Sequence, residues 1–341
     1  MKSIAFLLLT AGLILNPVHL WADAYYESRV LRIIVGYSPG GSYDGAARLI
    51  AAHLPKHLPG IKEVVVENKP GGGSLVTANY LAYKAKPDGL TIGSISPSMT
   101  LLQARKSPKI KFDFREMRWI GSSGKANHSC FLSRRVGVND IQALRGVAEP
   151  VKLGSTRIGS GTYDAATLFK NLFNLPVKVI PGFKGTKGIH LAIEQGEVDG
   201  ACHDWTTAKF VSPHLLESAN ESQLIPMVAS NPSDDTTLDG VPLYRNLITD
   251  ANYMQAYNTW ESTHHYRRPL LAPPGTPEDR VAILRDAIEA TLNDPGLLAD
   301  AAKSGLEIIA THGDQLQEVF DNVLNIPESV LDTLDVLLPA K

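Results

Sequence analysis

The sequence contains little cysteine, no excess of basic charge and only one long apolar run. Lys and Arg together number 33 against 35 for Asp and Glu, so the formal net charge is -2. A protein that follows nucleic-acid phosphates usually carries a basic excess, so we expect no nucleic-acid partner. A single apolar run among 341 residues also excludes a protein that spans a membrane many times.

The one apolar run covers residues 4–15 and follows Lys2. It is too short to cross a bilayer core about 30 Å thick as a helix. A charged start, a short apolar core and the small residues Ala22 and Ala24 are typical of a secretory signal peptide. We therefore predict that residues 1–24 are a signal peptide cleaved after Ala24, with Ala22 as the second choice and an uncleaved anchor as the alternative.

Cysteine occurs only at Cys130 and Cys202. Two cysteines are too few for a disulfide-stapled scaffold, and a zinc site needs more ligands at close spacing, so we expect no metal. In an exported protein an even pair indicates one bridge. We predict a Cys130–Cys202 disulfide near the expected domain crossover; two separately buried thiols are the alternative.

Segments rich in β-formers alternate with helical patterns along the chain. Strands are expected at residues 31–35, 64–66, 90–92, 151–153, 177–180 and 198–202. This alternation predicts parallel βαβ units. The pattern restarts near residue 151, and the chain exceeds one usual domain of roughly 100–150 residues, so two α/β domains are predicted.

Two segments share one pattern, residues 41–46 (GSYDGA) and 161–166 (GTYDAA). Each follows a predicted strand and opens a predicted helix, with Ser42 and Thr162 at the expected N-cap. Free amides at a helix start form an anion site, so the pair predicts a clamp on a small anion across a cleft. The alternative is two ordinary capped turns. Asp44 and Asp164 in the first turns would compete with an anion or bind a hydroxyl or amine on it.

Motifs of common enzymes are missing from the sequence. It contains no Gly-x-Ser-x-Gly and no His-Glu-x-x-His. The glycines near residue 40 lack the spacing of a dinucleotide site or a phosphate loop, so no cofactor is expected. His203 and Asp204 follow a predicted strand, and we interpret them, with Trp205, as ligand contacts rather than as an acid–base pair.

Four segments carry a family resemblance. Residues 32–44 (RIIVGYSPGGSYD) look like a strand followed by a Pro-Gly-Gly-x-x-Asp loop, and residues 66–73 (VENKPGGG) are similar to Val-Glu-Asn-x-Pro-Gly-x-Gly. Residues 87–92 (PDGLTI) match a Pro-Asp-Gly-Tyr-Thr turn, and residues 271–277 (LAPPGTP) match Leu-Ala-Pro-x-Gly-Thr-Pro. In this order they resemble the periplasmic solute receptors of tripartite tricarboxylate transporters, the Bug/TctC family, over nearly the whole chain after residue 24.

The resemblance implies a type II periplasmic-binding-protein fold, with two α/β domains joined by crossing hinge strands and a ligand cleft between them. Residues 25–131 plus 229–341 would form domain I and residues 132–228 domain II. The implied protein is a monomeric periplasmic receptor, not an enzyme. It would capture a small carboxylate and deliver it to the large and small membrane subunits of a transporter. A receptor that presents its ligand to a membrane sensor, or an exported hydrolase using His203 and Asp204, are the alternatives.

The resemblance also implies ligand contacts from both domains. The expected ligand-binding residues are Tyr37, Pro39, Gly40, Gly41, Ser42, Tyr43, Asp44, Ser96, Ser98, Ser160, Gly161, Thr162, Tyr163, Phe183, Gly185, His203, Asp204 and Trp205. Residues 198–205 (VDGACHDW) depart from the Val-Asp-x-x-Phe-Asp-Asn of common members. Citrate, dicarboxylates, amino acids and aromatic acids therefore all stay open as ligands.

We predict that the exported protein begins at Tyr25, because the small residues at 22 and 24 flank the expected cleavage site. The intact mass of the protein recovered from the periplasm measures this directly. A mass that still includes residues 1–24 would contradict both the cleavage site and export by this route.

Overall fold

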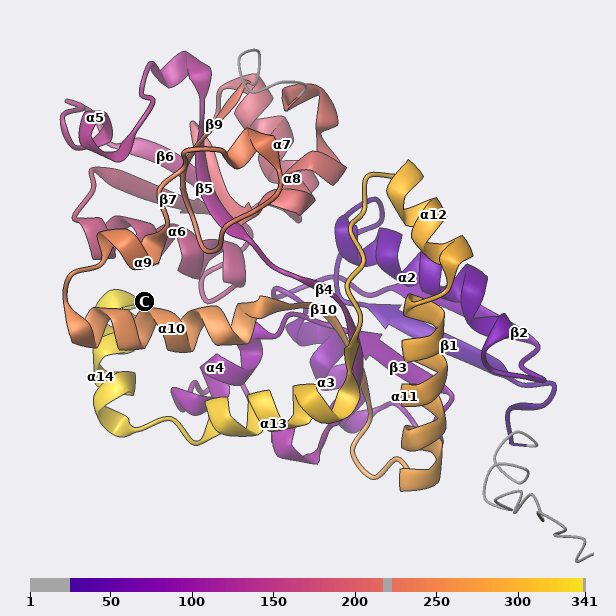
Figure 1. Ribbon diagram of the computed structural model, residues 1–341. Helices are drawn as coiled ribbons and strands as arrows, with labels where there is room; N and C mark the ends of the chain where they lie inside the picture. The colour runs from indigo at the N-terminus through magenta and orange to yellow at the C-terminus, as the bar shows by residue number, and fades with distance from the viewer. Residues whose placement is uncertain (1–24, 217–222, 340–341) are drawn as a thin grey trace, which may run out of the picture.

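Two separate β-sheets, each covered by helices on both faces, divide the protein into two lobes (Figure 1). The computed structural model describes residues 25–216 and 223–339, so the predicted signal peptide lies outside the described residues. Among the helices of these two ranges, none is both long and apolar enough to cross a membrane.

The sheet of the first lobe has six strands in the order β11-β4-β10-β3-β1-β2. β1 pairs in parallel with β2 and β3, whereas β10 runs antiparallel to β3 and β4. The strands are β1 (Val30–Val35), β2 (Glu63–Asn68), β3 (Thr91–Ser94), β4 (Arg118–Lys125), β10 (Tyr266–Ala272) and β11 (Thr311–His312).

Alternate residues of this sheet pack against helices on opposite faces. Ile33 and Ile92 face the core that contains Ile50 and Leu284, whereas Trp119 faces the other core and stacks on Phe320 with ring centroids 4.0 Å apart. The helices on the first face are α2 (Ser42–His53), α11 (Glu278–Leu292) and α12 (Pro295–Lys303). Those on the second face are α3 (Leu75–Tyr83), α4 (Ser98–Ala104) and α13 (Gly313–Leu324).

The sheet of the second lobe has five strands in the order β7-β6-β8-β5-β9. β6 pairs in parallel with β7 and β8, and β5 runs antiparallel to β8 and β9. The strands are β5 (His128–Ser133), β6 (Val151–Ser155), β7 (Val177–Pro181), β8 (Gly200–Asp204) and β9 (Leu224–Ala229). The helices of this lobe are α5 (Ile141–Arg145), α6 (Gly161–Phe173), α7 (Thr186–Gln195), α8 (Trp205–Val211) and α9 (Tyr244–Leu247).

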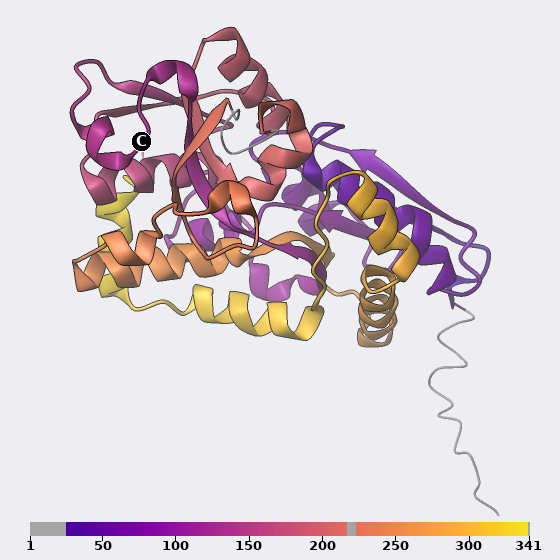
Figure 2. The same cartoon turned by 45° about the horizontal axis from the view of Figure 1, so that its top comes forward.

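The chain passes between the lobes along nearly continuous elements. β4 ends at Lys125 in the first sheet and β5 begins at His128 in the second. On the return, α10 (Ala251–His265) leads directly into β10, and α10 and α14 (Glu328–Leu337) both pack against α6 of the second lobe. Figure 2 shows α10 and α13 lying along the side of the molecule that joins the lobes. The expected domain changes at residues 131/132 and 228/229 fall inside β5 and β9, and the division at these residues stays a prediction.

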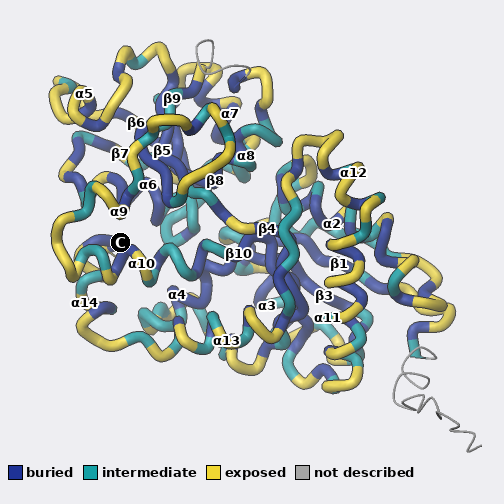
Figure 3. Tube along the Cα trace, in the orientation of Figure 1, coloured by how far each residue is buried: buried dark blue, intermediate teal, exposed yellow. Residues whose placement is uncertain are grey.

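All six predicted strands are present, and the expected parallel pairing is confirmed within each lobe. The antiparallel strands β4, β5, β9 and β10 were not predicted from local pattern. β10 is buried along its whole length, as the burial map in Figure 3 shows, but its sequence YRRPLLA contains two arginines and a proline, which are untypical of a central strand.

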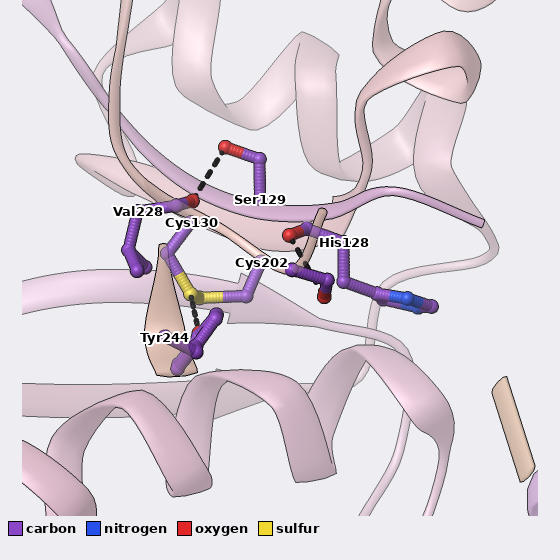
Figure 4. The surroundings of a disulfide bond; sticks show 7 residues. His128, Ser129, Cys130, Cys202, Val228 and Tyr244 are labelled. Carbon is purple, nitrogen blue, oxygen red and sulfur yellow. Dashed lines mark hydrogen bonds between the residues drawn. A yellow bond between two sulfur atoms is a disulfide. The ribbon is translucent and has the colours of Figure 1, made fainter. Parts of the chain in front are cut away.

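Cys130 of β5 and Cys202 of β8 lie directly opposite each other in the antiparallel pair and form the predicted disulfide. Figure 4 shows the bond beneath the strand, with the Tyr244 hydroxyl 3.2 Å from Cys130 Sγ. On the neighbouring residue, Ser129 Oγ donates to the carbonyl of Val228 at 2.9 Å. The disulfide therefore ties the central strand β8 of the second sheet to its neighbour β5, which begins close to the lobe junction.

We predict that the Cys130→Ala, Cys202→Ala double variant loses about 4 kcal/mol of unfolding free energy, because the bond closes a loop with a sequence separation of 72. Urea unfolding of both proteins measures this loss. Alkylation of denatured, unreduced protein provides the control, and labelling of either cysteine would contradict the bond.

Candidate functional site

A cleft between the lobes is lined by residues from both sheets and from the elements that connect them, with a cavity volume of about 120 Å³. The first lobe contributes the loop between β1 and α2 and the turn after β3. The second lobe contributes the loops that precede α6, α7 and α8. The lining residues are Tyr37, Ser38, Pro39, Gly41, Ser42, Tyr43, Ser96, Pro97, His128, Thr156, Ser160, Gly161, Thr162, Lys184, Gly185, Thr186, Lys187, His203, Asp204, Thr207, His264 and Arg267.

The loop before α2 is held in shape by Asp44. Gly40 adopts φ 83°, a left-handed conformation that favours glycine, and its amide donates to Asp44 Oδ2 at 2.9 Å. The same carboxylate accepts from Arg48 and, at 2.9 Å, from Asn68. Burial acts to raise the pKa of Asp44, but Arg48, the Gly40 amide and Asn68 together hold it below its usual range. Asp44 therefore braces the loop and does not line the cleft.

The loop before α6 is closed by a ring of hydroxyl groups. Ser160 is the N-cap, and its Oγ accepts from the Tyr163 amide at 3.3 Å. Thr162 Oγ1 accepts from the Thr156 amide at 3.0 Å and lies 3.1 Å from Ser160 Oγ. The hydroxyls therefore shape the loop, and the first amides of α6 stay free of intrahelical partners.

The prediction that Ser42 and Thr162 are N-caps is wrong. α2 begins at Ser42 after the N-cap Gly41, which supplies no side chain, and Ser160 caps α6. Serine and glycine are both common N-cap residues, which explains why the observed caps lie one or two residues before the predicted ones. The helix starts themselves lie at the cleft, one from each lobe, as expected.

Arg267 is a buried cation at the junction of the lobes. Its guanidinium lies 2.7 Å from the Asp204 carboxylate and donates to the hydroxyls of Thr206, at 2.6 Å, and Thr207. A fourth contact, at 3.4 Å, reaches Ser42 Oγ in the other lobe. Burial acts to raise the pKa of Asp204, but Arg267 and the Thr206 hydroxyl hold it below its usual range. The charge of Arg267 is thus balanced within the protein.

His203 and Asp204 do not form a catalytic pair. His203 Nδ1 lies 2.9 Å from the backbone carbonyl of Asp204, and its Nε2 lies 2.9 Å from His190 Nε2. The Asp204 carboxylate instead bonds to Arg267 and to the Asn127 amide. Burial lowers the pKa of His203 to about 4, so the ring is neutral near pH 7. This geometry does not support the hydrolase alternative.

The structure brings most of the expected site residues to the cleft. Those that line it are Tyr37, Pro39, Gly41, Ser42, Tyr43, Ser96, Ser160, Gly161, Thr162, Gly185, His203 and Asp204. Those that do not are Gly40, Asp44, Ser98, Tyr163, Phe183 and Trp205. Trp205 is 1% exposed and donates from Nε1 to Thr237 Oγ1 at 2.8 Å, so it belongs to the core of the second lobe. Ser98 hydrogen-bonds to Ser96 at 2.7 Å, behind the lining.

Sequence reasoning missed several residues that line the cleft. They are His128, Thr156, Lys187, Thr207, His264 and Arg267. His128, His264 and Arg267 lie where β5, α10 and β10 cross between the lobes. No spacing in the sequence links these positions, because antiparallel pairing of distant segments brings them together.

Comparisons with known proteins agree with this architecture. No family model matches the chain. A UPF0065 protein of Bordetella pertussis is 23% identical over 93% of this chain and 92% of its own length. The BugT protein of the same species is 25% identical over 90% of this chain and 89% of its own. These relatives agree with the resemblance to the Bug/TctC family that the sequence motifs indicate. A UPF0065 protein of Cupriavidus necator is 34% identical, over 30% of this chain and 29% of its own length.

Solved structures show that this protein has the fold of periplasmic binding proteins. The periplasmic binding protein BugD superposes with a TM-score of 0.70 at 20% identity, covering 92% of this chain and 99% of its own. A malate-bound MatC from Rhodopseudomonas palustris superposes with a TM-score of 0.68 at 21% identity, covering 91% and 99%. The expected two-lobed α/β fold is therefore confirmed.

We predict that Asp204→Asn destabilises the protein by about 3–5 kcal/mol, because it leaves the buried Arg267 guanidinium without a counter-ion. Asn remains a good N-cap for α8, so the loss reports the charge. In the parent protein, the folded pKa of Asp204 is depressed. Its contribution is therefore complete above the unfolded pKa of about 3.9 and disappears as the pH falls through the folded value.

Urea unfolding of both proteins, repeated between pH 7 and pH 3, measures the size and pH dependence of this contribution. Asp314→Asn is the matched control, because Asp314 pairs with Arg285 but is 71% exposed, and it should cost less than about 1 kcal/mol. Equal effects of the two substitutions would contradict the importance of the buried pair.

Proposed function

We propose that this protein is a periplasmic receptor that captures a small carboxylate in the cleft and delivers it to the membrane subunits of a tripartite tricarboxylate-type transporter. One observation carries the proposal. The starts of α2 and α6 lie at the same cleft from opposite lobes, each with the positive end of its helix dipole toward the lining. Two such starts suit an anion held between them.

The charges of the cleft support a ligand bound mainly by amides and hydroxyls. Asp204 is the acidic residue among the lining residues, and Arg267 already neutralises it. Lys184 and Lys187 lie at the start of α7 and add positive charge to the rim. The net charge of the lining therefore favours a carboxylate over a cation.

The ligands of structural neighbours agree with this proposal. One neighbour from R. palustris was solved with adipate and another with malate. A third, from Polaromonas, is described as a TctC solute-binding protein. These ligands are small carboxylates, and we infer the same class here. The predicted signal peptide agrees with a receptor that works in the periplasm.

We predict that this receptor binds at least one small carboxylic acid and binds the corresponding amide far more weakly, because the amide lacks the charge that the helix starts stabilise. A thermal-shift screen of carboxylates followed by calorimetry on one hit provides the measurement. Equal affinity for acid and amide would show that the two loops are only capped turns.

Thr162→Val tests the loop in the second lobe. It should weaken binding by about tenfold, because the Thr156 amide loses its acceptor and the loop that positions the first amides of α6 loosens. Thr167→Val is the matched control on the same helix. Thr167 does not line the cleft, and its hydroxyl has no hydrogen-bond partner within the described chain, so affinity should not change.

A further inference from the structure

Two histidines that line the cleft each have a buried ring nitrogen without a hydrogen-bond partner in the described chain, Nδ1 of His128 and Nε2 of His264, and the second lies beside a helix start. His264, near the end of α10, lines the cleft and is 4% exposed. Its Nε2 is buried and has no partner among residues 25–216 and 223–339. A Cβ added to Gly161 would lie 3.0 Å from this nitrogen. Nε2 therefore lies against the first residue of α6, where the proposed carboxylate would bind.

The contacts of the other ring nitrogen define the tautomer of His264. Nδ1 lies 2.8 Å from the Trp260 carbonyl and 2.7 Å from Thr263 Oγ1, and the Thr263 hydroxyl itself donates to the same carbonyl at 2.7 Å. A carbonyl oxygen only accepts, so Nδ1 must carry the proton. Nε2 then presents a lone pair and acts as an acceptor.

His264 is neutral at ordinary pH. Burial lowers its pKa to about 4, although the Trp260 carbonyl and Glu261 favour the charged form. The ring faces His128 from β5, with centroids 5.3 Å apart, and burial holds the pKa of His128 well below its usual value. Arg267, Asp204 and His203 complete the charged or titratable groups around His128. None of these contacts supplies a proton to His264 Nε2.

A ligand at the start of α6 would meet two different kinds of group. The free amides of the helix donate hydrogen bonds and suit a carboxylate, whereas His264 Nε2 beside them can only accept. A carboxylate oxygen facing Nε2 would place two lone pairs together. The ligand atom that faces Nε2 should therefore carry a hydrogen. With the carboxylate at the start of α6, a substituent on the adjacent carbon would be placed to reach Nε2.

Two hydrogen-bond donors are common on that carbon, a hydroxyl and an ammonium. The charge of the cleft favours the hydroxyl. An ammonium would need a free carboxylate, but Asp204 is bonded to Arg267. Because Arg267 and Asp204 neutralise each other, Lys184 and Lys187 give the lining a positive balance, which opposes a further cation. A hydroxyl satisfies the acceptor without adding charge.

We propose that His264 makes this receptor selective for 2-hydroxycarboxylates, by accepting a hydrogen bond from the ligand hydroxyl while the start of α6 binds the adjacent carboxylate. This inference rests on the proposed function and names the ligand class of the same cleft. His264 would then be a specificity-determining residue. A site built to bond a hydroxyl rejects the analogue without it, because its own buried polar group is left unpaired.

Matched ligands that differ at one carbon test the inference. L-malate, succinate and L-aspartate carry a hydroxyl, a hydrogen and an ammonium at the same position, and lactate, propionate and alanine form a shorter set. Calorimetry at pH 7 should show, for at least one set, that the hydroxy acid binds at least about tenfold more tightly than the other two acids of that set. Titration in two buffers of different ionisation enthalpy should show no proton uptake.

Variants at His264 separate selectivity from a structural role. His264→Phe keeps a ring to stack on Trp260, whose centroid lies 4.4 Å away, but removes the acceptor, so the ratio of hydroxy to deoxy affinity should fall to about one. His264→Gln supplies an amide oxygen and should retain a preference for the hydroxy acid. His265→Phe is the control next in the chain, does not line the cleft and should keep the ratio of the parent.

The outcomes distinguish this inference from the function on which it rests. Carboxylates that bind without preference for the hydroxyl, a ratio that His264→Phe leaves unchanged, or uptake of a proton on binding would overturn the role of His264 alone. Failure of every carboxylate to bind would overturn the proposed function and the inference together.

Discussion

The structure depends on neutralising one buried cation, Arg267. A guanidinium taken out of water costs several kcal/mol unless its donors find acceptors and its charge finds a partner. Here the partner is Asp204 of β8, and the hydroxyls of Thr206 and Thr207 at the start of α8 take further donors. Because Arg267 belongs to a strand of the first sheet and Asp204 to a strand of the second, satisfying this charge sets how the two lobes meet.

The pairing of Arg267 with Asp204 determines which groups of the neighbouring cleft are left to bind a ligand. Since Arg267 and Asp204 neutralise each other, neither offers a free charge to a ligand. Recognition is left to the partial charges of helix starts and to neutral groups such as His264. Dipoles held by the fold would bind the proposed anion without a desolvated side-chain charge opposite it, which would also let that ligand leave again. That property suits a receptor in a transport system.

Well-packed elements beneath the cleft hold its lining groups in place. β5 is tied to β8 by the Cys130–Cys202 bond and to β9 by its ladder of hydrogen bonds. α10 packs between the lobes and carries His264 at its end, where the helix passes into β10. The groups that touch the proposed ligand therefore come from the ends of well-packed elements. Their positions depend on cores in both lobes rather than on the loops alone.

Local sequence pattern predicted the elements whose signal is local. The parallel strands were predicted from short β-rich runs, and the disulfide was predicted from a single pair of cysteines in a chain expected to be exported. Composition also predicted that the protein has no nucleic-acid partner, which stays a prediction. The repeated segments at residues 41–46 and 161–166 located both helix starts of the cleft, although their caps proved to be Gly41 and Ser160.

The tertiary structure alone decided which distant residues share the cleft. His264 lies far from Gly161 in the sequence, yet its ring lies against that residue. Arg267 likewise contacts Asp204 and Ser42, which belong to separate lobes. These contacts depend on the register of antiparallel strands far apart in sequence. Register follows from the packing of whole sheets and leaves no periodic mark at the residues concerned. The amino-acid sequence thus determined the elements and the bridge, whereas the fold determined the site, because a ligand is bound by neighbours in space.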